Sequence, residues 1–151
     1  MPSLSPDIVA CLSAVPDGLR RALIDAFDSI VRNYREHRWE PAELSGGKFA
    51  EAAYWVVEGA LSGSYAPHVS KPNNFRQSCG ALEQRYPNHL KSLRILIPQV
   101  LTIMYEVRNN RNVGHLGADV DPNQIDALLI LNSAKWVMAE LIRILHTGSI
   151  D

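Results

Sequence analysis

The sequence has little cysteine and almost no excess of either charge. Cys11 and Cys79 are the two cysteines among 151 residues, and they lack the paired spacing of a disulfide framework or a cysteine zinc site. This favours a reducing compartment, so we expect a cytoplasmic protein. Fifteen Lys and Arg against sixteen Asp and Glu give a formal net charge of -1, so no overall field attracts nucleic acid or a membrane surface. Any binding site for a polyanion must therefore depend on basic residues clustered in one place.

Long hydrophobic runs are also missing. None reaches the roughly 20 apolar residues that a membrane-spanning helix needs. The short apolar run IVACLSAVP follows Asp7 with no basic residue before it, unlike a signal peptide. We therefore expect no membrane partner. Repeats and low-complexity tracts are absent, which favours a single domain over residues 1–151, with an N-terminal segment at 1–15 and an irregular connection at 62–86.

Strand-like alternation of apolar and polar residues is missing as well. Apolar residues instead recur every three or four positions, which is typical of amphipathic helices. Long helices are expected at about 17–39, 45–62, 87–107 and 122–145, with a short helical piece around 77–85. The predicted fold class is all-α, a four-helix up-and-down bundle with one or two short extra helices.

Local signals define the ends and the core positions of these helices. Ser45 is expected to cap the second helix and Gly63 to end it. Pro98 is expected to kink the third helix, and Asp121 to cap the fourth. Among the aromatic residues, Phe49 and Trp136 fall on apolar stripes and are predicted in the core, whereas Tyr54 and Trp55 are either packed or free to stack on a bound ligand.

Two familiar site patterns are incomplete. No glutamate is followed three residues later by histidine, as the di-iron carboxylate bundles require. SGGK at 45–48 lacks the upstream glycine and the following Ser or Thr of a phosphate-binding loop. We therefore predict no metal and no cofactor, and we expect Gly46 and Gly47 to be first-turn residues that let the second helix approach a neighbour closely.

The stretch VRNNRNVGHLGADVDP, residues 107–122, places arginines and a histidine where the third helix ends. In a straight helix Arg108 and His115 would be roughly 10 Å apart along the axis, but the glycines around His115 favour a turn. An arginine fork and a histidine together can bind phosphate and move a proton near neutral pH. The alternative is that arginines at a helix end simply complement the helix dipole.

Arg108, Asn109 and His115 resemble the R-x(4–6)-H motif of HEPN domains, with six residues between the arginine and the histidine. The stretch LSGGKFAEAAYWVVEGALSGSY, residues 44–65, is similar to the glycine-lysine-aromatic helix of a bacterial HEPN group allied to abortive-infection proteins. With the order of the helices, the two pieces cover most of the chain from the first long helix onward.

The resemblance implies a metal-independent endoribonuclease of phage defence or a toxin–antitoxin system. Its active site would form between the two subunits of a homodimer, and cleavage by a 2′-hydroxyl would leave 2′,3′-cyclic phosphate and 5′-hydroxyl ends. The partners would be RNA, for which tRNA is one candidate, and an antitoxin or defence-complex protein. Arg108 and His115 would be catalytic, and the supporting or RNA-binding residues would be Asn109, Arg111, Lys48 and Glu51.

Two other interpretations stay open at this point. Arg111, Lys48 and Glu51 are equally well explained as solvated helix residues. A HEPN-like domain can also be a non-catalytic module that binds RNA or a nucleotide, or that dimerises, as a subunit of a larger defence complex.

Overall fold

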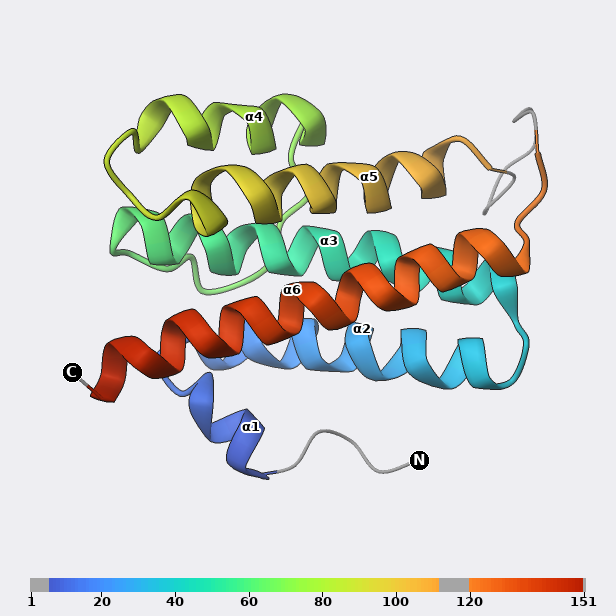
Figure 1. The fold of residues 1–151 in the computed structure, drawn as a ribbon, viewed down its shortest axis with the longest axis horizontal. Coiled ribbons are helices and arrows are strands. Elements are labelled where there is room, and N and C mark those ends of the chain that lie inside the picture. The colour runs from blue at the N-terminus through green and yellow to red at the C-terminus, as the bar shows by residue number, and fades with distance from the viewer. Residues whose placement is uncertain (1–5, 112–119, 151) are drawn as a thin grey trace.

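Four long helices form the body of the molecule (Figure 1). The computed structural model describes residues 6–111 and 120–150. The long helices are α2 (Asp17–Arg35), α3 (Trp39–Ser62), α5 (Ile97–Asn109) and α6 (Gln124–Ile150). Each runs opposite to the one before it, in the up-and-down order (Figure 1). Within the described ranges the secondary structure is helical apart from one isolated β-bridge, so the prediction of an all-α fold is confirmed.

Three shorter elements complete the chain. α1 (Pro6–Cys11) packs on α6, and α4 (Phe75–Arg85) lies outside the bundle against α5 (Figure 1). A π-helical turn, η1 (Ser92–Leu96), leads directly into α5. The short helical piece predicted around 77–85 is α4. In the part of the chain that is described, no helix combines the length and apolar content needed to cross a bilayer.

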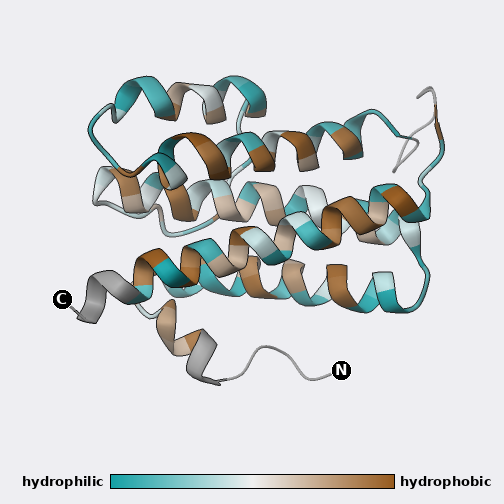
Figure 2. Cartoon of the chain, in the orientation of Figure 1, coloured by the Kyte–Doolittle hydropathy of each residue, from teal (hydrophilic) through white to brown (hydrophobic). Residues whose placement is uncertain are grey.

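α3 is the central helix of the bundle, because it packs against α2, α5 and α6. Its alanines and glycines bring these neighbours close, and Phe49 is fully buried, as predicted. A Cβ on Gly46 would lie 2.7 Å from Cγ2 of Ile130 in α6. Figure 2 shows hydrophobic residues interspersed with hydrophilic ones along each long helix.

The boundary between the first two long helices differs from the prediction. α2 ends at Arg35, and α3 begins at Trp39, so Ser45 lies inside the helix and caps nothing. His37 adopts a φ of 59°, a left-handed conformation that breaks the helical path. Pro41 lies in the first turn of α3, where the N–H that proline lacks would have no helical partner. Gly46 and Gly47 are therefore not first-turn residues.

Pro98 makes the start of α5 irregular. Its ring excludes the usual helical contact with the carbonyl four residues earlier and supplies no N–H. The chain meets this constraint with the π-helical turn Ser92–Leu96 just before the proline, so the regular part of the third helix begins at Ile97 instead of near Pro87. Leu90, which falls within the predicted range of the third helix, is exposed.

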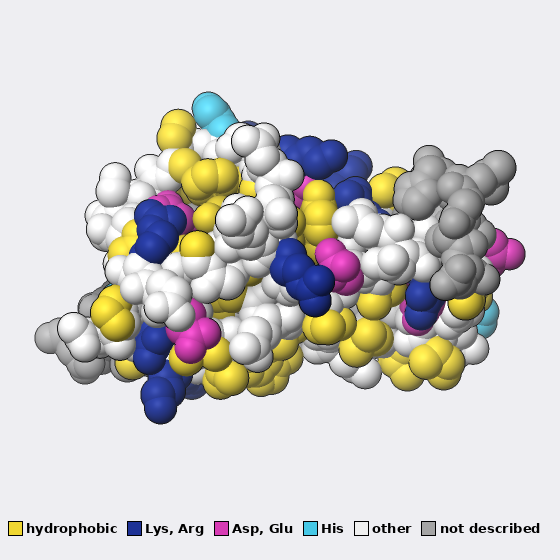
Figure 3. All heavy atoms as spheres, turned by 90° about the horizontal axis from the view of Figure 1, so that it is seen from above, with side chains coloured by type: hydrophobic (Ala, Val, Ile, Leu, Met, Phe, Trp, Pro, Cys, Tyr) yellow, Lys and Arg dark blue, Asp and Glu magenta, His cyan; other side chains and the backbone are white. Residues whose placement is uncertain are grey.

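The prediction for α6 was wrong about its cap and about Trp136. The helix begins at Gln124, and the side chain of Asn123, not Asp121, accepts the first-turn hydrogen bond, from the amide of Asp126 at 3.0 Å. Trp136 is exposed, because a neighbouring stripe of α6 faces the core instead: Ala127, Ile130, Ala134, Val137 and Leu141. Figure 3 shows hydrophobic side chains gathered along the edge of the molecule formed by α6.

Candidate functional site

The candidate site lies at the end of the bundle where α5 ends and where α3 and α6 begin, on the right in Figure 1. Arg111 and Val120 pair there through an isolated β-bridge. The predicted catalytic His115 falls between them, outside the described residues. Its distance from Arg108 therefore stays a prediction from the sequence.

Arg108, in the last turn of α5, lies directly on α3 at Gly47. A Cβ placed on Gly47 would come within 2.3 Å of Cδ and 2.7 Å of Nε of Arg108. Any other residue at 47 would therefore displace the arginine side chain. The prediction that this glycine permits a close approach is confirmed, and the neighbour that it admits is the predicted catalytic arginine.

An aromatic stack holds the guanidinium group of Arg108. Its Cζ lies 4.8 Å from the centroid of the Tyr105 ring, in a cation–π arrangement. Tyr105 in turn stacks on Phe75 of α4, with ring centroids 4.3 Å apart. The Oδ1 of Asn109 accepts a hydrogen bond of 3.3 Å from Nη2 of Arg108. The predicted pair Arg108 and Asn109 is thus in direct contact.

The electrostatic surroundings of Arg108 leave its positive charge available. Among the residues that the structure describes, no carboxylate lies within ion-pair distance of its guanidinium. Its Nε is buried, and no described group accepts a hydrogen bond from it. A preorganised guanidinium with unused donors is suited to a phosphate oxygen.

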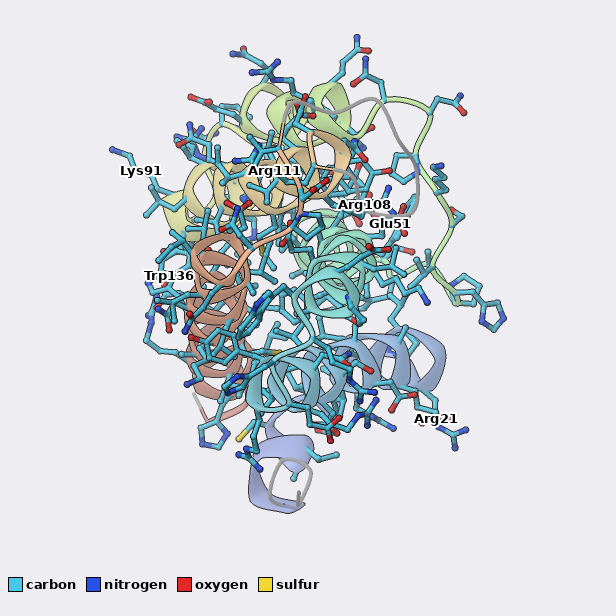
Figure 4. All side chains as sticks on the ribbon, turned by 90° about the vertical axis from the view of Figure 1, so that its right-hand side faces the viewer. Arg21, Glu51, Lys91, Arg108, Arg111 and Trp136 are labelled. Atoms are coloured by element: carbon cyan, nitrogen blue, oxygen red, sulfur yellow. The ribbon has the colours of Figure 1, made fainter. Side chains whose placement is uncertain are left out.

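Glu51 lies beside Arg108 on the same side of the bundle (Figure 4). Its Oε2 accepts a hydrogen bond of 3.4 Å from the hydroxyl of Tyr105. Burial raises the pKa of Tyr105, the negative charge of Glu51 raises it further, and Arg108 acts against both. The tyrosine therefore stays protonated and connects the predicted supporting residue to the predicted catalytic one.

Lys48, also predicted to support the site, is exposed on α3 next to Gly47. It lines a hollow of about 340 Å³ between α2 and α3, together with Glu51 and Ser45. The structure thus brings Lys48 and Glu51 to one surface, with Glu51 between the lysine and Tyr105.

Arg111 belongs to a different cluster. Its Nε donates a hydrogen bond of 2.6 Å to Oδ2 of Asp126, and Nη2 lies 3.4 Å from Oδ1. Asn123 also donates to Oδ2, at 3.0 Å. Figure 4 shows Arg108 and Arg111 on different sides of the end of α5. The ion pair ties the chain after α5 to the first turn of α6.

Glu43 lies behind this ion pair. It is fully buried, and among the described residues its carboxyl group has no side-chain hydrogen-bond partner, although the backbone N–H of Asn123 approaches it. Burial, followed by the charge of Asp126, raises its pKa to about 7, while Arg111 opposes the shift. Arg111 therefore forms an ion pair with Asp126 of α6 and also attracts the charged form of Glu43 on α3 electrostatically.

Several residues of this region were missed from the sequence. Tyr105 precedes Arg108 by three positions and so shares its helix face, which is a signal the sequence does carry. Glu43 was not predicted as a buried helix residue, because α3 was predicted to begin after it. No sequence spacing indicates the ion pair of Asp126, because its partner Arg111 lies outside α6.

Comparison of the chain with models of protein families, with curated proteins and with solved structures finds no match. Within residues 6–111 and 120–150, no group of three or more His, Cys, Asp or Glu side chains is arranged to hold a metal ion.

Proposed function

We propose that this protein is an endoribonuclease of the HEPN type that cleaves RNA without a metal ion. The observation that carries the proposal is the state of Arg108: it is fixed over Tyr105 and against Gly47, and within the described residues no carboxylate neutralises it. A structural arginine at a helix end would be expected to pair, as Arg111 does with Asp126.

In the proposed reaction, the 2′-hydroxyl of a ribose attacks the adjacent phosphorus while its proton passes to a base. Arg108 donates to the phosphate oxygens and stabilises the charge of the pentacoordinate transition state. The bond to the 5′ oxygen breaks, that oxygen takes a proton, and a 2′,3′-cyclic phosphate remains. His115 is proposed as the group that transfers the proton. Asn109 orients Arg108, and Lys48 binds the RNA backbone next to Glu51.

The near-neutral charge of the protein bears on the kind of RNA. Binding through many phosphate contacts requires many cations, and here Arg111 is already engaged by Asp126. A structured RNA such as a tRNA, recognised by its shape, or an RNA delivered by an antitoxin or defence-complex partner, fits this surface better than unselective binding.

We further propose that a second copy of the chain completes the site. Supporting this, exposed apolar side chains lie at the same end of the bundle: Leu44 on α3, Val120 at the β-bridge and Ile125 in the first turn of α6, which is 72% exposed. Covering them with a second protomer would bring the two copies of the region around Arg108 together.

The test is cleavage of total RNA in the presence of a chelator by the wild type, Arg108→Ala and His115→Ala, followed by analysis of the fragment ends. We expect cyclic-phosphate ends from the wild type and at least about 100-fold slower cleavage by each variant. Equal cleavage by all three would show that the activity comes from elsewhere and would refute the proposal.

Two controls separate chemistry from binding. Arg108→Lys keeps the charge but loses the planar fork, so we expect it to retain RNA binding with little cleavage. An oligonucleotide with 2′-deoxyribose at the cleaved position should bind but stay intact. Cleavage of that substrate would exclude the 2′-hydroxyl mechanism.

The second candidate function is a non-catalytic RNA- or nucleotide-binding module. It is favoured by the fact that the binding half of the site, Arg108 with Asn109 and Tyr105, is complete among the described residues without His115. In that case RNA would bind to the wild type and not to Arg108→Ala, His115→Ala would bind normally, and none of the three would cleave.

A further inference from the structure

A second hollow, separate from the Arg108 site, lies between α4 and the start of α5. Its volume is about 390 Å³, within the range of sites for small molecules. It is lined from α4 by Arg76, Cys79 and Gly80, and from the facing element by Arg94, Pro98 and Thr102, among others. None of these residues takes part in the proposed RNA site.

Gly80 is the least expected residue of this hollow. It lies in the middle of α4, where glycine costs about 1 kcal/mol relative to alanine. A Cβ at this position would meet no atom of the described residues within 4 Å, and Gly63 is the one described glycine with a positive φ. Neither packing nor backbone conformation requires a glycine at 80. Its effect is to leave the hollow open.

The floor of the hollow is uncharged. Cys79 is buried, and burial raises the pKa of its thiol to about 12, so the sulfur carries no charge near neutral pH. Thr102 donates its hydroxyl hydrogen bond to the carbonyl of Pro98 at 2.9 Å. With Ile95 and Pro98 these groups offer a largely apolar surface.

The two arginines of the hollow differ in the number of hydrogen bonds that they make with the protein. Arg94 donates from Nε to the carbonyl of His89 at 3.1 Å and from Nη1 to the carbonyl of Glu83 at 3.2 Å. It is thereby fixed, close to the Glu83 carboxylate that also lines the hollow. Arg76, in the first turn of α4, is exposed and has no ion-pair partner among the described residues.

We propose that this hollow binds a small organic anion with an apolar body. The body lies on Cys79, Ile95 and Pro98, in the space that Gly80 leaves free, and the anionic group pairs with Arg76. Arg76 is the anchor because its fork is uncommitted, whereas Arg94 is held by two carbonyls and shares its surroundings with Glu83. The site is independent of the proposed nuclease function.

The test uses two fluorescent probes with the same ring system: 1-anilinonaphthalene-8-sulfonate, an anion, and N-phenyl-1-naphthylamine, which lacks the sulfonate. We expect saturable binding of the anion to the wild type, about tenfold tighter than that of the neutral probe. In Arg76→Gln the two probes should bind equally. No saturable binding to the wild type, or an unchanged preference for the anion in Arg76→Gln, would overturn the proposal.

A pair of leucine substitutions tests the location. Gly80→Leu fills the hollow and is expected to abolish saturable binding while leaving the melting temperature unchanged or higher, because leucine favours the helix. Gln84→Leu adds the same side chain to an exposed position of α4 outside the lining and should bind normally. Trp136→Gln controls for the exposed apolar side chains of α6. Retained binding in Gly80→Leu, or loss of binding in Trp136→Gln, would place the probe elsewhere.

Discussion

At the scale of single residues, the absence of a side chain at Gly47 sets the position of Arg108. The arginine crosses α3 at a point where even a methyl group would overlap its Cδ. It then reaches the ring of Tyr105, which α4 supports through Phe75. Residues from three helices thus fix one guanidinium group, and each can be changed without removing the arginine itself.

Gly47→Ala should therefore separate activity from stability. The new methyl displaces the flexible arginine side chain, while alanine favours the helix by about 1 kcal/mol over glycine. We expect RNA cleavage to fall by about tenfold or more, with the free energy of unfolding unchanged or slightly raised. Kinetics and urea unfolding of the same preparations measure the two effects.

Gly46→Ala is the matched control for this substitution. Its methyl would meet Ile130, a fully buried side chain with little room to move. We expect a loss of about 1–3 kcal/mol in the free energy of unfolding from overpacking. If Gly47→Ala instead loses stability like Gly46→Ala and keeps its activity, the contact with Arg108 does not position the site.

Glu43 gives the protein a predictable dependence of stability on pH. Its pKa is about 7 in the fold, against a usual value of 4.5. Between these two values the folded state keeps a proton that the unfolded state has lost, so stability falls as the pH rises from about 4.5 to 7. Above pH 7 the decrease in the free energy of unfolding, relative to its value below pH 4.5, is constant and on the order of 3 kcal/mol.

Glu43→Gln removes this titration. We expect the variant to match the wild type near pH 4.5 and to be more stable than it at pH 8, as measured by urea unfolding at several pH values. Glu40→Gln, a change at an exposed position of the same helix, should leave the pH profile nearly unchanged. Parallel profiles for the wild type and Glu43→Gln would mean that Glu43 is not protonated in the fold.

At the scale of elements, helix interiors were easier to predict than helix ends. The apolar spacing was sufficient for the existence of all four long helices, because periodicity reflects burial along many residues. The ends depend on individual turns: Asn123 and Asp121 are both good caps, and the sequence does not say which one the chain path favours. Ser45 was misassigned as a cap for the same reason.

The cap of α6 can be tested directly. Asn123 accepts from the amide of Asp126 and donates to its carboxylate. Asn123→Ala should therefore lower the free energy of unfolding by about 1–2 kcal/mol. Asp121→Ala, at the position predicted as the cap, should lower it by less than about half as much, measured by thermal or urea unfolding. Equal losses would mean that both residues hold the start of α6.

At the scale of the whole molecule, the polar residues of the proposed RNA site gather at one end of the bundle. The up-and-down order places the end of α5 beside the starts of α3 and α6, so residues far apart in the sequence meet there (Figure 1). The Arg111–Asp126 ion pair joins the elements that meet at this end, and Glu43 is buried beside it. Exposed Leu44, Val120 and Ile125 surround it.

Ile125→Lys should weaken the proposed homodimer. A lysine on the contact surface adds a charge that a second protomer would have to desolvate, so we expect the dimer to dissociate at least about tenfold more readily and cleavage to fall with it. Sedimentation equilibrium measures the association. Leu90→Lys, an equally drastic change at an exposed position near the opposite end of the bundle, is the control (Figure 1). An unchanged dimer in Ile125→Lys would place the contact on another surface.

The sequence by itself determined the helical class, the approximate extent of four helices and the choice of Arg108 with Asn109. These are local properties: periodicity, glycine stops and a short motif each depend on residues near one another in the chain. Only the tertiary structure decided which stripe of α6 is buried, since its apolar residues surround much of the helix and Trp136 fits the sequence pattern of a core residue. The same is true of the contact of Arg108 with Gly47 and of the Glu43, Arg111 and Asp126 cluster, because each joins elements whose relative positions no spacing within one helix encodes.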